Sequence, residues 1–266
     1  MSYMQTRHTD REKYFWEQAV TSEKYFFPFI EKLKPISTDT EVLEVGCGDG
    51  GNLYPFVIKN CKVTAVDRDP NRIQRARDFF DSHGYKVRLL HEDIFMLADI
   101  GLFDIILMND VIEHIPNPHK TKLLGLLKQW LKPNGIIFLG FPAWQMPFGG
   151  HQQICRNSLL AHLPFIHLLP LPLYKFLLKA FNEKENNIRE LISIRESKIT
   201  IEMYYRLVKQ LGFKIMDERL YLINPHYEVK FKLKPKILPK AVQKVPLLRN
   251  FFITACFAAL AAENKA

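Results

Sequence analysis

The sequence predicts an α/β fold with a mostly parallel sheet, and three observations lead to it. An apolar run at 42–45 alternates like a buried strand and ends in a glycine-rich turn. A second run, at 63–67, ends in an acid about 20 residues downstream, as the second strand of a paired βα unit does. Further apolar runs alternate with helical segments as far as Phe141, which is typical of parallel strands joined by crossovers.

The turn after the first strand is the most informative stretch of the chain. Residues 41–52 read Glu-Val-Leu-Glu-Val-Gly-Cys-Gly-Asp-Gly-Gly-Asn, with Gly46, Gly48 and Gly50 at every second position. Glycine removes the Cβ atom where a backbone turns tightly and approaches a ligand. Asp67, at the end of the second strand, can accept hydrogen bonds from two ribose hydroxyls. Together the two units predict a site for a nucleotide-type cofactor.

The remaining elements follow in an order that keeps the sheet parallel. We expect three more strands and one long helix, at 85–90, 103–108, 135–141 and 117–131. Polar segments follow the third and fourth strands, at 91–94 and 109–115. Ligands of open parallel sheets collect at the carboxyl edge of the strands, so these segments should face the cofactor.

These elements resemble the class I S-adenosylmethionine-dependent methyltransferases over residues 40–140. The resemblance implies a Rossmann-like, seven-stranded sandwich with an antiparallel last strand and a helical cap inserted after the fifth strand. It pairs a strand at 213–223 with the last strand, within 251–262. A dehydrogenase is the competitor, but its third glycine usually comes three residues after the second, and Asp49 would repel a pyrophosphate.

The resemblance implies S-adenosylmethionine as methyl donor and S-adenosylhomocysteine as product. Asp93 would accept a hydrogen bond from the adenine amino group, and Ile94 would donate its backbone N–H to the ring. Glu44 would anchor the loop or meet the ligand's ammonium group, or serve as a buried structural carboxylate, whereas Cys47 more simply packs in the loop. The expected cofactor residues are Glu44, Gly46, Cys47, Gly48, Gly50, Asn52, Asp67, Arg68, Asp93, Ile94 and Asn109.

The catalytic groups must lie on the acceptor side, because the sulfonium already carries an activated methyl group. We expect Glu113, His114 and His151 there, with a histidine as general base because its ordinary pKa lies near operating pH. The pattern Asp110-x-x-Glu-His resembles the metal-binding segment of the ubiquinone-biosynthesis O-methyltransferases and of the small-RNA 3′-terminal 2′-O-methyltransferases. Glu-His is also widespread in metal-free members, so a divalent metal held by these four residues stays open.

Length and composition fit one domain. With 266 residues and 47% apolar content, the chain can bury a full core. We divide it into an N-terminal helical lid, a cofactor core, a substrate cap and a C-terminal hairpin with a basic segment, at 1–38, 39–141, 142–197 and 198–266. The lid would cover the cofactor with Tyr14 or Tyr25, or simply pack on the sheet. Four cysteines without a pairing pattern and a polar first ten residues predict a cytoplasmic protein.

The net charge of +9 is concentrated toward the C-terminus. Between 229 and 262 there are seven basic residues and no acid. Such a segment suits an anionic membrane surface, a nucleic acid or an acidic substrate. The alternative is a half-exposed strand, because Lys230, Lys232 and Lys234 alternate with apolar residues.

Two apolar stretches do not have the form of membrane spans. Residues 159–181 are interrupted by three prolines, and 251–262 are well short of the roughly 20 residues that a spanning helix needs. The first stretch lies in the expected cap. It predicts an apolar acceptor or peripheral contact with a membrane interface, or a cap that only packs on the core.

These features predict methyl transfer to an oxygen of a small-molecule or lipid-like acceptor, with histidine-assisted deprotonation. Two alternatives stay open. One is a methyltransferase of RNA or another nucleic acid, which the basic segment favours; the other is a non-catalytic cofactor-binding protein of the same fold. The acceptor is selected by the cap, whose sequence shows polarity but no shape, and oligomeric state leaves no signal in the sequence.

Overall fold

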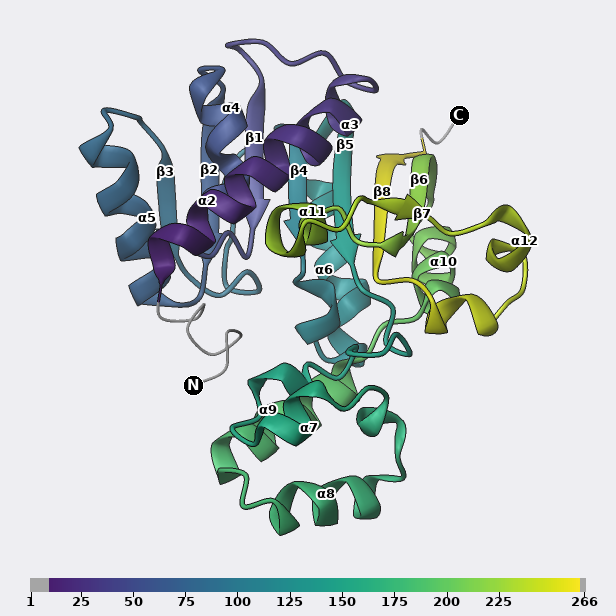
Figure 1. Cartoon of the computed structure of the whole chain (residues 1–266). Coiled ribbons are helices and arrows are strands. Elements are labelled where there is room, and N and C mark those ends of the chain that lie inside the picture. Colours follow the sequence, from purple (N-terminus) through teal and green to yellow (C-terminus); the bar gives the residue numbers. More distant parts are fainter. Residues whose placement is uncertain (1–9, 264–266) are drawn as a thin grey trace.

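Eight strands form one sheet, in the order β3-β2-β1-β4-β5-β8-β6-β7 (Figure 1). The computed structural model describes residues 10–263, so most of the polar start from which we predict a cytoplasmic protein lies outside the described residues. The strands are β1 Glu41–Val45, β2 Lys62–Asp67, β3 Arg88–His91, β4 Phe103–Asn109, β5 Leu131–Phe141, β6 Phe213–Ile223, β7 Lys236–Ile237 and β8 Ala255–Ala262.

The strand directions confirm the predicted sheet except in the number of strands. β1 to β5 are parallel, and β8 runs antiparallel between β5 and β6. The expected count of seven is wrong, because Lys236 and Ile237 fold back onto β6 and pair with Ile223 and Tyr221. A strand of two residues is too short to show an apolar alternation in the sequence.

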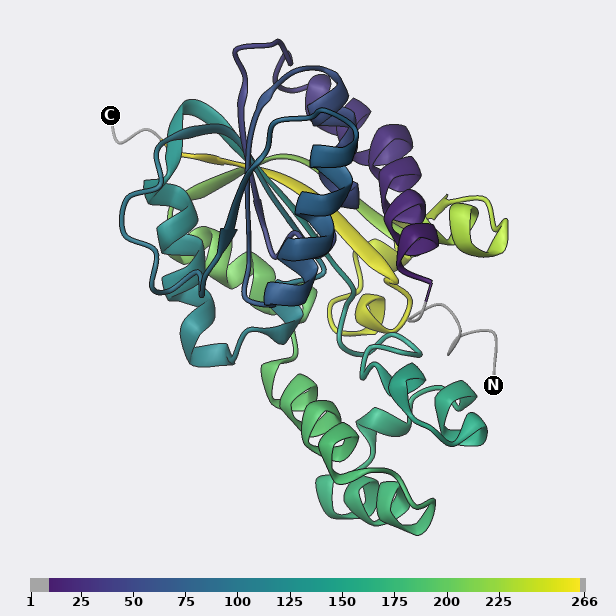
Figure 2. The same cartoon turned by 90° about the vertical axis from the view of Figure 1, so that its left-hand side faces the viewer.

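Helices cover both faces of the sheet (Figure 2). On one face lie α2, α4 and α5, and on the other α6 and α10, with bounds Arg11–Thr21, Tyr54–Ile58, Pro70–Ser82, Asn117–Gln129 and Ile201–Gln210. Neighbouring residues of β1 enter opposite cores. Leu43 and Val45 pack with α6 and α10, whereas Val42 packs with α2 and α5. The strands are buried on both sides, which explains their nearly continuous apolar runs.

The expected N-terminal helical segment is present and is interrupted once. After α2 the chain makes a π-helical turn, Ser22–Phe26, and continues as α3, Phe27–Glu31. The Phe26 ring lies 4.8 Å from Phe138 and 5.1 Å from Phe257, between ring centroids. Much of the aromatic content of this segment therefore packs on the sheet.

The expected strand at Lys230–Lys234 is wrong. Pro225 precedes a short helix, α11 His226–Phe231, and the pattern of alternating lysines spans this helix and the loop after it. The helix packs on α2, where the Thr21 Oγ1 and His226 Nδ1 atoms are 2.9 Å apart. The rest of the basic segment contains α12, Lys240–Gln243, and a 3₁₀ turn, Leu248–Phe251.

The chain after β5 forms a helical unit beyond the carboxyl end of the sheet (Figures 1 and 2). Its helices are α7 Ser158–His162, α8 Leu171–Ala180 and α9 Glu185–Ser197. They share a small core of their own, in which Tyr174 and Leu178 are fully buried. Within residues 10–263, no helix combines the length and the apolar character that crossing a bilayer requires.

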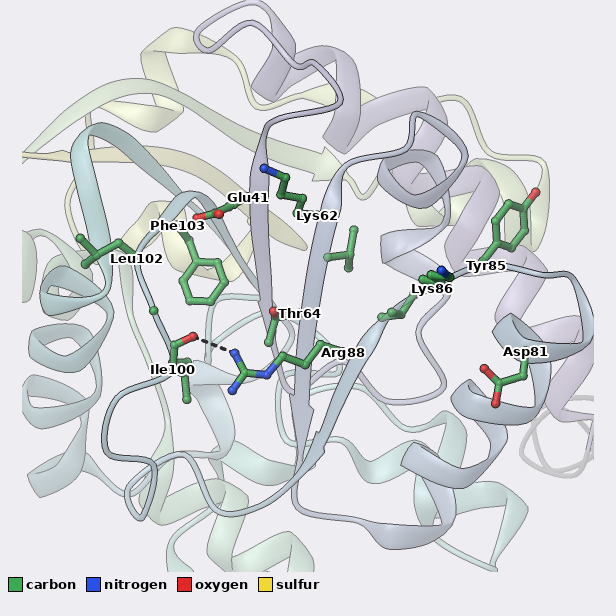
Figure 3. Close-up of a pocket in the computed structure, with 13 residues that line it drawn as sticks. Glu41, Lys62, Thr64, Asp81, Tyr85, Lys86, Arg88, Ile100, Leu102 and Phe103 are labelled. Carbon is green, nitrogen blue, oxygen red and sulfur yellow. Dashed lines mark hydrogen bonds between the residues drawn. The ribbon is translucent and has the colours of Figure 1, made fainter.

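The connection from β3 to β4, residues 92–102, contains no helix. Beside it an open groove of about 720 Å³ runs along the amino-terminal ends of β1, β2 and β3 (Figure 3). Arg88 points into this groove and donates a hydrogen bond to the Ile100 carbonyl, 3.1 Å away. The groove lies at the opposite end of the strands from the glycine-rich turn.

Candidate functional site

The glycine-rich turn is tied to the end of the second strand by backbone hydrogen bonds. The Gly46 and Cys47 amides donate to the Val66 carbonyl, at 2.8 and 3.1 Å. The Gly48 amide donates to Asp67 Oδ2 at 2.8 Å, and the Asp69 amide donates to Asp67 Oδ1 at 2.9 Å. Asp67 thus aligns both loops, and each carboxylate oxygen still has capacity to accept from a ligand hydroxyl.

Close contacts on both sides of the turn require glycine. Gly46 has φ +69°, and a Cβ atom there would lie 2.5 Å from Val111 Cγ2 in the loop after β4. At Gly51 a Cβ atom would lie 2.5 Å from the Phe15 carbonyl oxygen of α2. The turn is therefore pressed between the loop after β4 on one side and the N-terminal helix on the other.

Glu44, in the strand that leads into the turn, has a buried carboxyl group. Asn52 Nδ2 donates to Glu44 Oε1 at 2.9 Å, while Glu44 Oε2 is buried without a hydrogen-bond partner. Burial raises the pKa of the Glu44 carboxyl to about 8, against the lowering effect of Asn52. A positively charged group near Oε2 would satisfy the free oxygen and restore the charged form.

Two small cavities adjoin the turn, of about 70 and 30 Å³. Both are lined by Tyr14 and Gln18 of α2 and by Asn52, Asn109 and Asp110. Ligand pockets usually measure roughly 300–1,000 Å³. The helix α2 therefore covers the space over the turn closely.

A second group of polar side chains lies beyond β4 and β5. Glu113, His114 and His151 each place one ligand-type atom within 4.8 Å of the others. The two imidazole centroids are 4.9 Å apart, and His114 Nε2 lies 4.0 Å from Glu113 Oε1. Both Glu113 carboxylate oxygens are buried without a hydrogen-bond partner.

The local electrostatics keep both histidines neutral. Burial, together with the neighbouring His151, lowers the pKa of His114 to about 3, and burial lowers the pKa of His151 to about 4. Burial, followed by the charge of Asp110, raises the pKa of Glu113 well above its ordinary value. Two neutral imidazoles and a carboxyl group without a hydrogen-bond partner form a donor set that fits a divalent cation, whose charge would favour the ionised form of Glu113.

A buried lysine holds the loop that carries Glu113. Lys120 has no exposed surface, and its ammonium donates to the Ile112 carbonyl at 2.7 Å and to the Ile115 carbonyl. Burial lowers the pKa of Lys120 to about 8, which the charge of Glu113 opposes. The Lys120 side chain thereby stabilises the turn at 112–114.

A family model for a methyltransferase domain matches residues 15–167, more than half of the chain. The chain belongs to this methyltransferase family. Both the glycine-rich turn and the Glu113 cluster lie within the matched residues. With its parallel sheet and reversed strand, the protein is a class I S-adenosylmethionine-dependent methyltransferase.

Curated relatives resemble this methyltransferase over part of their length. A ubiquinone biosynthesis O-methyltransferase of Rickettsia prowazekii is 33% identical over 113 residues, which are 41% of this chain and 44% of that protein. One from Rickettsia canadensis is 34% identical over 99 residues, 37% of this chain and 41% of that protein. The chain thus spans less than half the length of these relatives.

Solved structures share the fold of this methyltransferase at low sequence identity. An S-adenosylmethionine-dependent methyltransferase from Clostridium acetobutylicum is 14% identical, with a TM-score of 0.59 over 98% of this chain and 99% of that one. A plantazolicin methyltransferase in complex with SAH is 14% identical, with a TM-score of 0.58 over 98% and 90%. The likeness extends through the segment after β5.

The cofactor residues expected in this methyltransferase lie along one edge of the sheet. Asp67 pairs with His91 in register, so Asp93 and Ile94 follow at the same edge. Asn109 ends β4 and lines both cavities. Arg68 follows β2, and the Cys47 side chain is buried in the core, where burial raises the pKa of the thiol.

Two expectations about charged residues need correction. The Nε and Nη2 atoms of Arg75 both lie 2.9 Å from the Asp49 carboxylate. Because Arg75 largely neutralises the charge of Asp49, this residue excludes a pyrophosphate less strongly than we expected. Asp110 is not part of the cluster formed by Glu113 and the histidines. It has φ +53° and accepts a hydrogen bond from Asn109 Nδ2 at 3.0 Å, on the cavity side.

Several residues that line the two cavities were not predicted from the sequence. Arg72 lies in the first turn of α5 and lines the larger cavity, with Gln18 of α2 beside it. Asn224 and His226 line the smaller cavity from the segment after β6. Asn224 and His226 are far in sequence from the glycine-rich turn, and no sequence pattern places them beside it. Only the packing of α11 on α2 brings them to this edge of the sheet. Tyr25 faces this segment and donates its hydroxyl to Glu228.

Proposed function

We propose that this methyltransferase transfers the methyl group of S-adenosylmethionine to an oxygen of a small-molecule or lipid-like acceptor. The Glu113, His114 and His151 cluster is the observation that carries the proposal, because it joins the loops after β4 and β5 beside the cofactor turn. The curated relatives named as ubiquinone biosynthesis O-methyltransferases support an oxygen acceptor.

On the donor side, the chain binds and orients the sulfonium ligand. Asp67 accepts the ribose hydroxyls, and the unpaired Oε2 of Glu44 meets the ammonium group directly or through water. Asp93 and Ile94 bind the adenine ring. Tyr14 and Gln18 close over the ligand as part of a lid, because both side chains line the two cavities.

On the acceptor side, the histidines receive a proton from the attacking hydroxyl. A general base works best when its pKa lies near the operating pH, and a pKa of about 3 makes His114 a weak base by itself. Because burial and Asp110 raise the pKa of Glu113, its carboxyl compensates only in the charged form, in which it stabilises the imidazolium that forms when His114 is protonated. The cap carries His151 and selects the acceptor.

The same cluster supports a second proposal, a divalent metal. The unpaired oxygens of Glu113 and the neutral rings of His114 and His151 are suited to Mg²⁺, Mn²⁺ or Zn²⁺. When bound, such a metal lowers the pKa of a hydroxyl that it contacts. The three residues then hold and orient the acceptor rather than take its proton.

We also place this activity in a reducing, cytoplasmic compartment. All four cysteines are buried and unpaired. Unpaired cysteines are the rule where thiols are kept reduced.

The test is methyl transfer from labelled S-adenosylmethionine to a panel of phenols, catechols, isoprenoid quinol precursors, lipids and RNA. We expect label on a phenolic or lipid-like hydroxyl, and at least a tenfold loss of kcat in His114→Ala and His151→Ala. Activity lost on chelation and regained with Mn²⁺ or Zn²⁺ would identify the metal-assisted form. Full turnover by both histidine variants would contradict the acid–base proposal.

The alternatives give different outcomes in the same assay. A nucleic-acid enzyme would label RNA and lose binding steeply with salt, since each phosphate contact releases counterions. A non-catalytic protein would bind S-adenosylhomocysteine but label nothing in the panel.

A further inference from the structure

Exposed apolar side chains are concentrated in two segments. Of seventeen large apolar side chains that are exposed in the described residues, twelve lie within 159–176 and 233–252. The segments meet in space, where the Phe165 and Phe251 ring centroids are 6.4 Å apart. In Figure 1, α8 lies at the lower end of the molecule and α12 at its right edge. We call this surface the outer face, formed around Leu163, Phe165, Leu247, Leu248, Phe251 and Phe252.

Two of these side chains are presented by strained backbone. Phe165 and Leu247 both have φ +64°, a conformation that bulky residues rarely adopt. The side chain of Leu247 nevertheless remains 64% exposed, and that of Phe165 40% exposed. Backbone strain with no gain in burial is typical of a segment under functional rather than packing constraint.

The charge around the outer face has one sign. Residues 155–182 and 229–262 contain no acid, while Lys236, Lys240 and Lys244 are exposed beside the apolar side chains. The nearby Glu202 of α10 is neutralised by Arg249 at 2.9 Å and accepts from the Leu247 amide at 3.0 Å. An apolar surface bordered by lysines matches the interface of an anionic bilayer, where side chains enter the headgroup region and lysines meet phosphates.

We propose that the outer face docks this methyltransferase on an anionic lipid bilayer. A nucleic acid would use the lysines but would leave the leucines and phenylalanines exposed. The bilayer uses both. Docking is a binding property and does not depend on methyl transfer, so it stands or falls separately from the proposed function.

The outer face is linked to the loop that carries His151. The Phe165 amide donates to the Pro147 carbonyl at 2.8 Å, and the His151 amide donates to the Phe148 carbonyl at 3.0 Å. A docked protein would therefore hold its acceptor side next to the bilayer. A lipid-like acceptor could then enter without crossing water.

The experiment is co-sedimentation of the full chain with vesicles of phosphatidylcholine containing 30% phosphatidylglycerol, against pure phosphatidylcholine. We expect binding to the anionic vesicles that weakens with salt. Lys240→Gln/Lys244→Gln should weaken it about 25-fold, since each lysine near an anionic surface contributes roughly fivefold. Leu247→Ser/Phe251→Ser should abolish it. The controls are Lys59→Gln/Lys209→Gln and Met96→Ser/Met216→Ser, which alter exposed residues elsewhere and should bind like wild type.

A spectroscopic probe separates insertion from simple charge attraction. The emission of Phe252→Trp should shift to shorter wavelength in anionic vesicles, whereas that of Met96→Trp should not. Unchanged melting temperatures show that the variants are folded. The proposal is overturned if wild type fails to sediment at low salt, or if both variant pairs bind like wild type. It is equally overturned if Leu247→Ser/Phe251→Ser only converts a dimer into a monomer, or if the lysine pair affects only RNA binding.

Discussion

Asp67 accepts hydrogen bonds from both loops that flank it, and we propose that these loops form the cofactor site. We expect Asp67→Asn to weaken the binding of S-adenosylhomocysteine at least tenfold, because one acceptor for the loop amides and for ribose is lost. Calorimetric titration measures this. Asp69→Asn is the matched control, since it removes the same charge from an exposed helix cap two residues away. Equal losses in both variants would show a general charge effect.

Glu44 predicts a pH dependence in the cofactor-free protein. Its folded pKa of about 8 lies above its ordinary value of 4.5, so the protonated form favours folding. This contribution is complete below pH 4.5 and is lost as pH rises through 8. The melting temperature of wild type should therefore fall relative to that of Glu44→Gln between pH 5 and pH 8. Parallel melting curves for the two proteins would contradict this.

At the residue scale, the sequence predicted which polar residues lie at the site better than it predicted which of them contact one another. His114 and His151 come together as expected, because each follows a neighbouring parallel strand. Asp110 shares the loop of His114 but turns away, since a backbone at φ +53° directs it to the cavity side. No local pattern marks such a conformation at a residue other than glycine. Asn224 and His226 could not be predicted, because a contact between distant helices brings them in.

The turn after β4 depends on one buried lysine. Lys120→Met removes the ammonium that donates to the Ile112 and Ile115 carbonyls, which costs roughly 1–3 kcal/mol and loosens the loop carrying Glu113. We expect a lower melting temperature and at least a tenfold lower kcat with unchanged affinity for S-adenosylhomocysteine.

Lys128→Met is the control for this prediction. Lys128 also donates to two carbonyls, those of Leu211 and Gly212, but away from the site. It should lose stability and keep kcat. If Lys128→Met lost as much kcat as Lys120→Met, the effect on the turn would be ruled out.

At the element scale, strands with sustained alternation were predictable and short elements were not. β1, β2 and β4 start within one residue of the expected position, because buried parallel strands show continuous apolar runs. The third strand begins only at Arg88, because its pairing with β2 starts there, opposite Thr64. The strand-like alternation at 229–234 covers the end of α11 and the loop after it, and six residues are too few to separate the two periods.

At the scale of the whole molecule, the N-terminal helix α2 covers the glycine-rich turn. The carbonyl of Phe15 contacts the turn, and cavities of 70 and 30 Å³ are smaller than a ligand of this kind needs. We expect α2 to open before the ligand enters. In stopped-flow experiments that follow Trp16 on α2, the observed rate should reach a plateau at high S-adenosylhomocysteine, and Trp16→Phe should lose the signal. A rate that rises linearly throughout would contradict a gating lid.

The overall architecture was predictable because consecutive parallel units fix the order of the central strands. The reversed strand and its partner were placed by resemblance to a known family, since alanines dominate β8 and give little pattern. The shape of the cap and its outer face were not predictable, because their form depends on how three short helices pack on each other.

The place of β8 in the sheet has a consequence for synthesis of the chain. β8 lies between β5 and β6 and pairs with both, although residues 255–262 are translated after them. While the ribosome has not yet released this segment, β5 and β6 each present an unpaired edge. Exposed edges are templates for association with other chains. The nascent chain therefore passes through a stage at which chaperone protection matters more than for a sheet built in order.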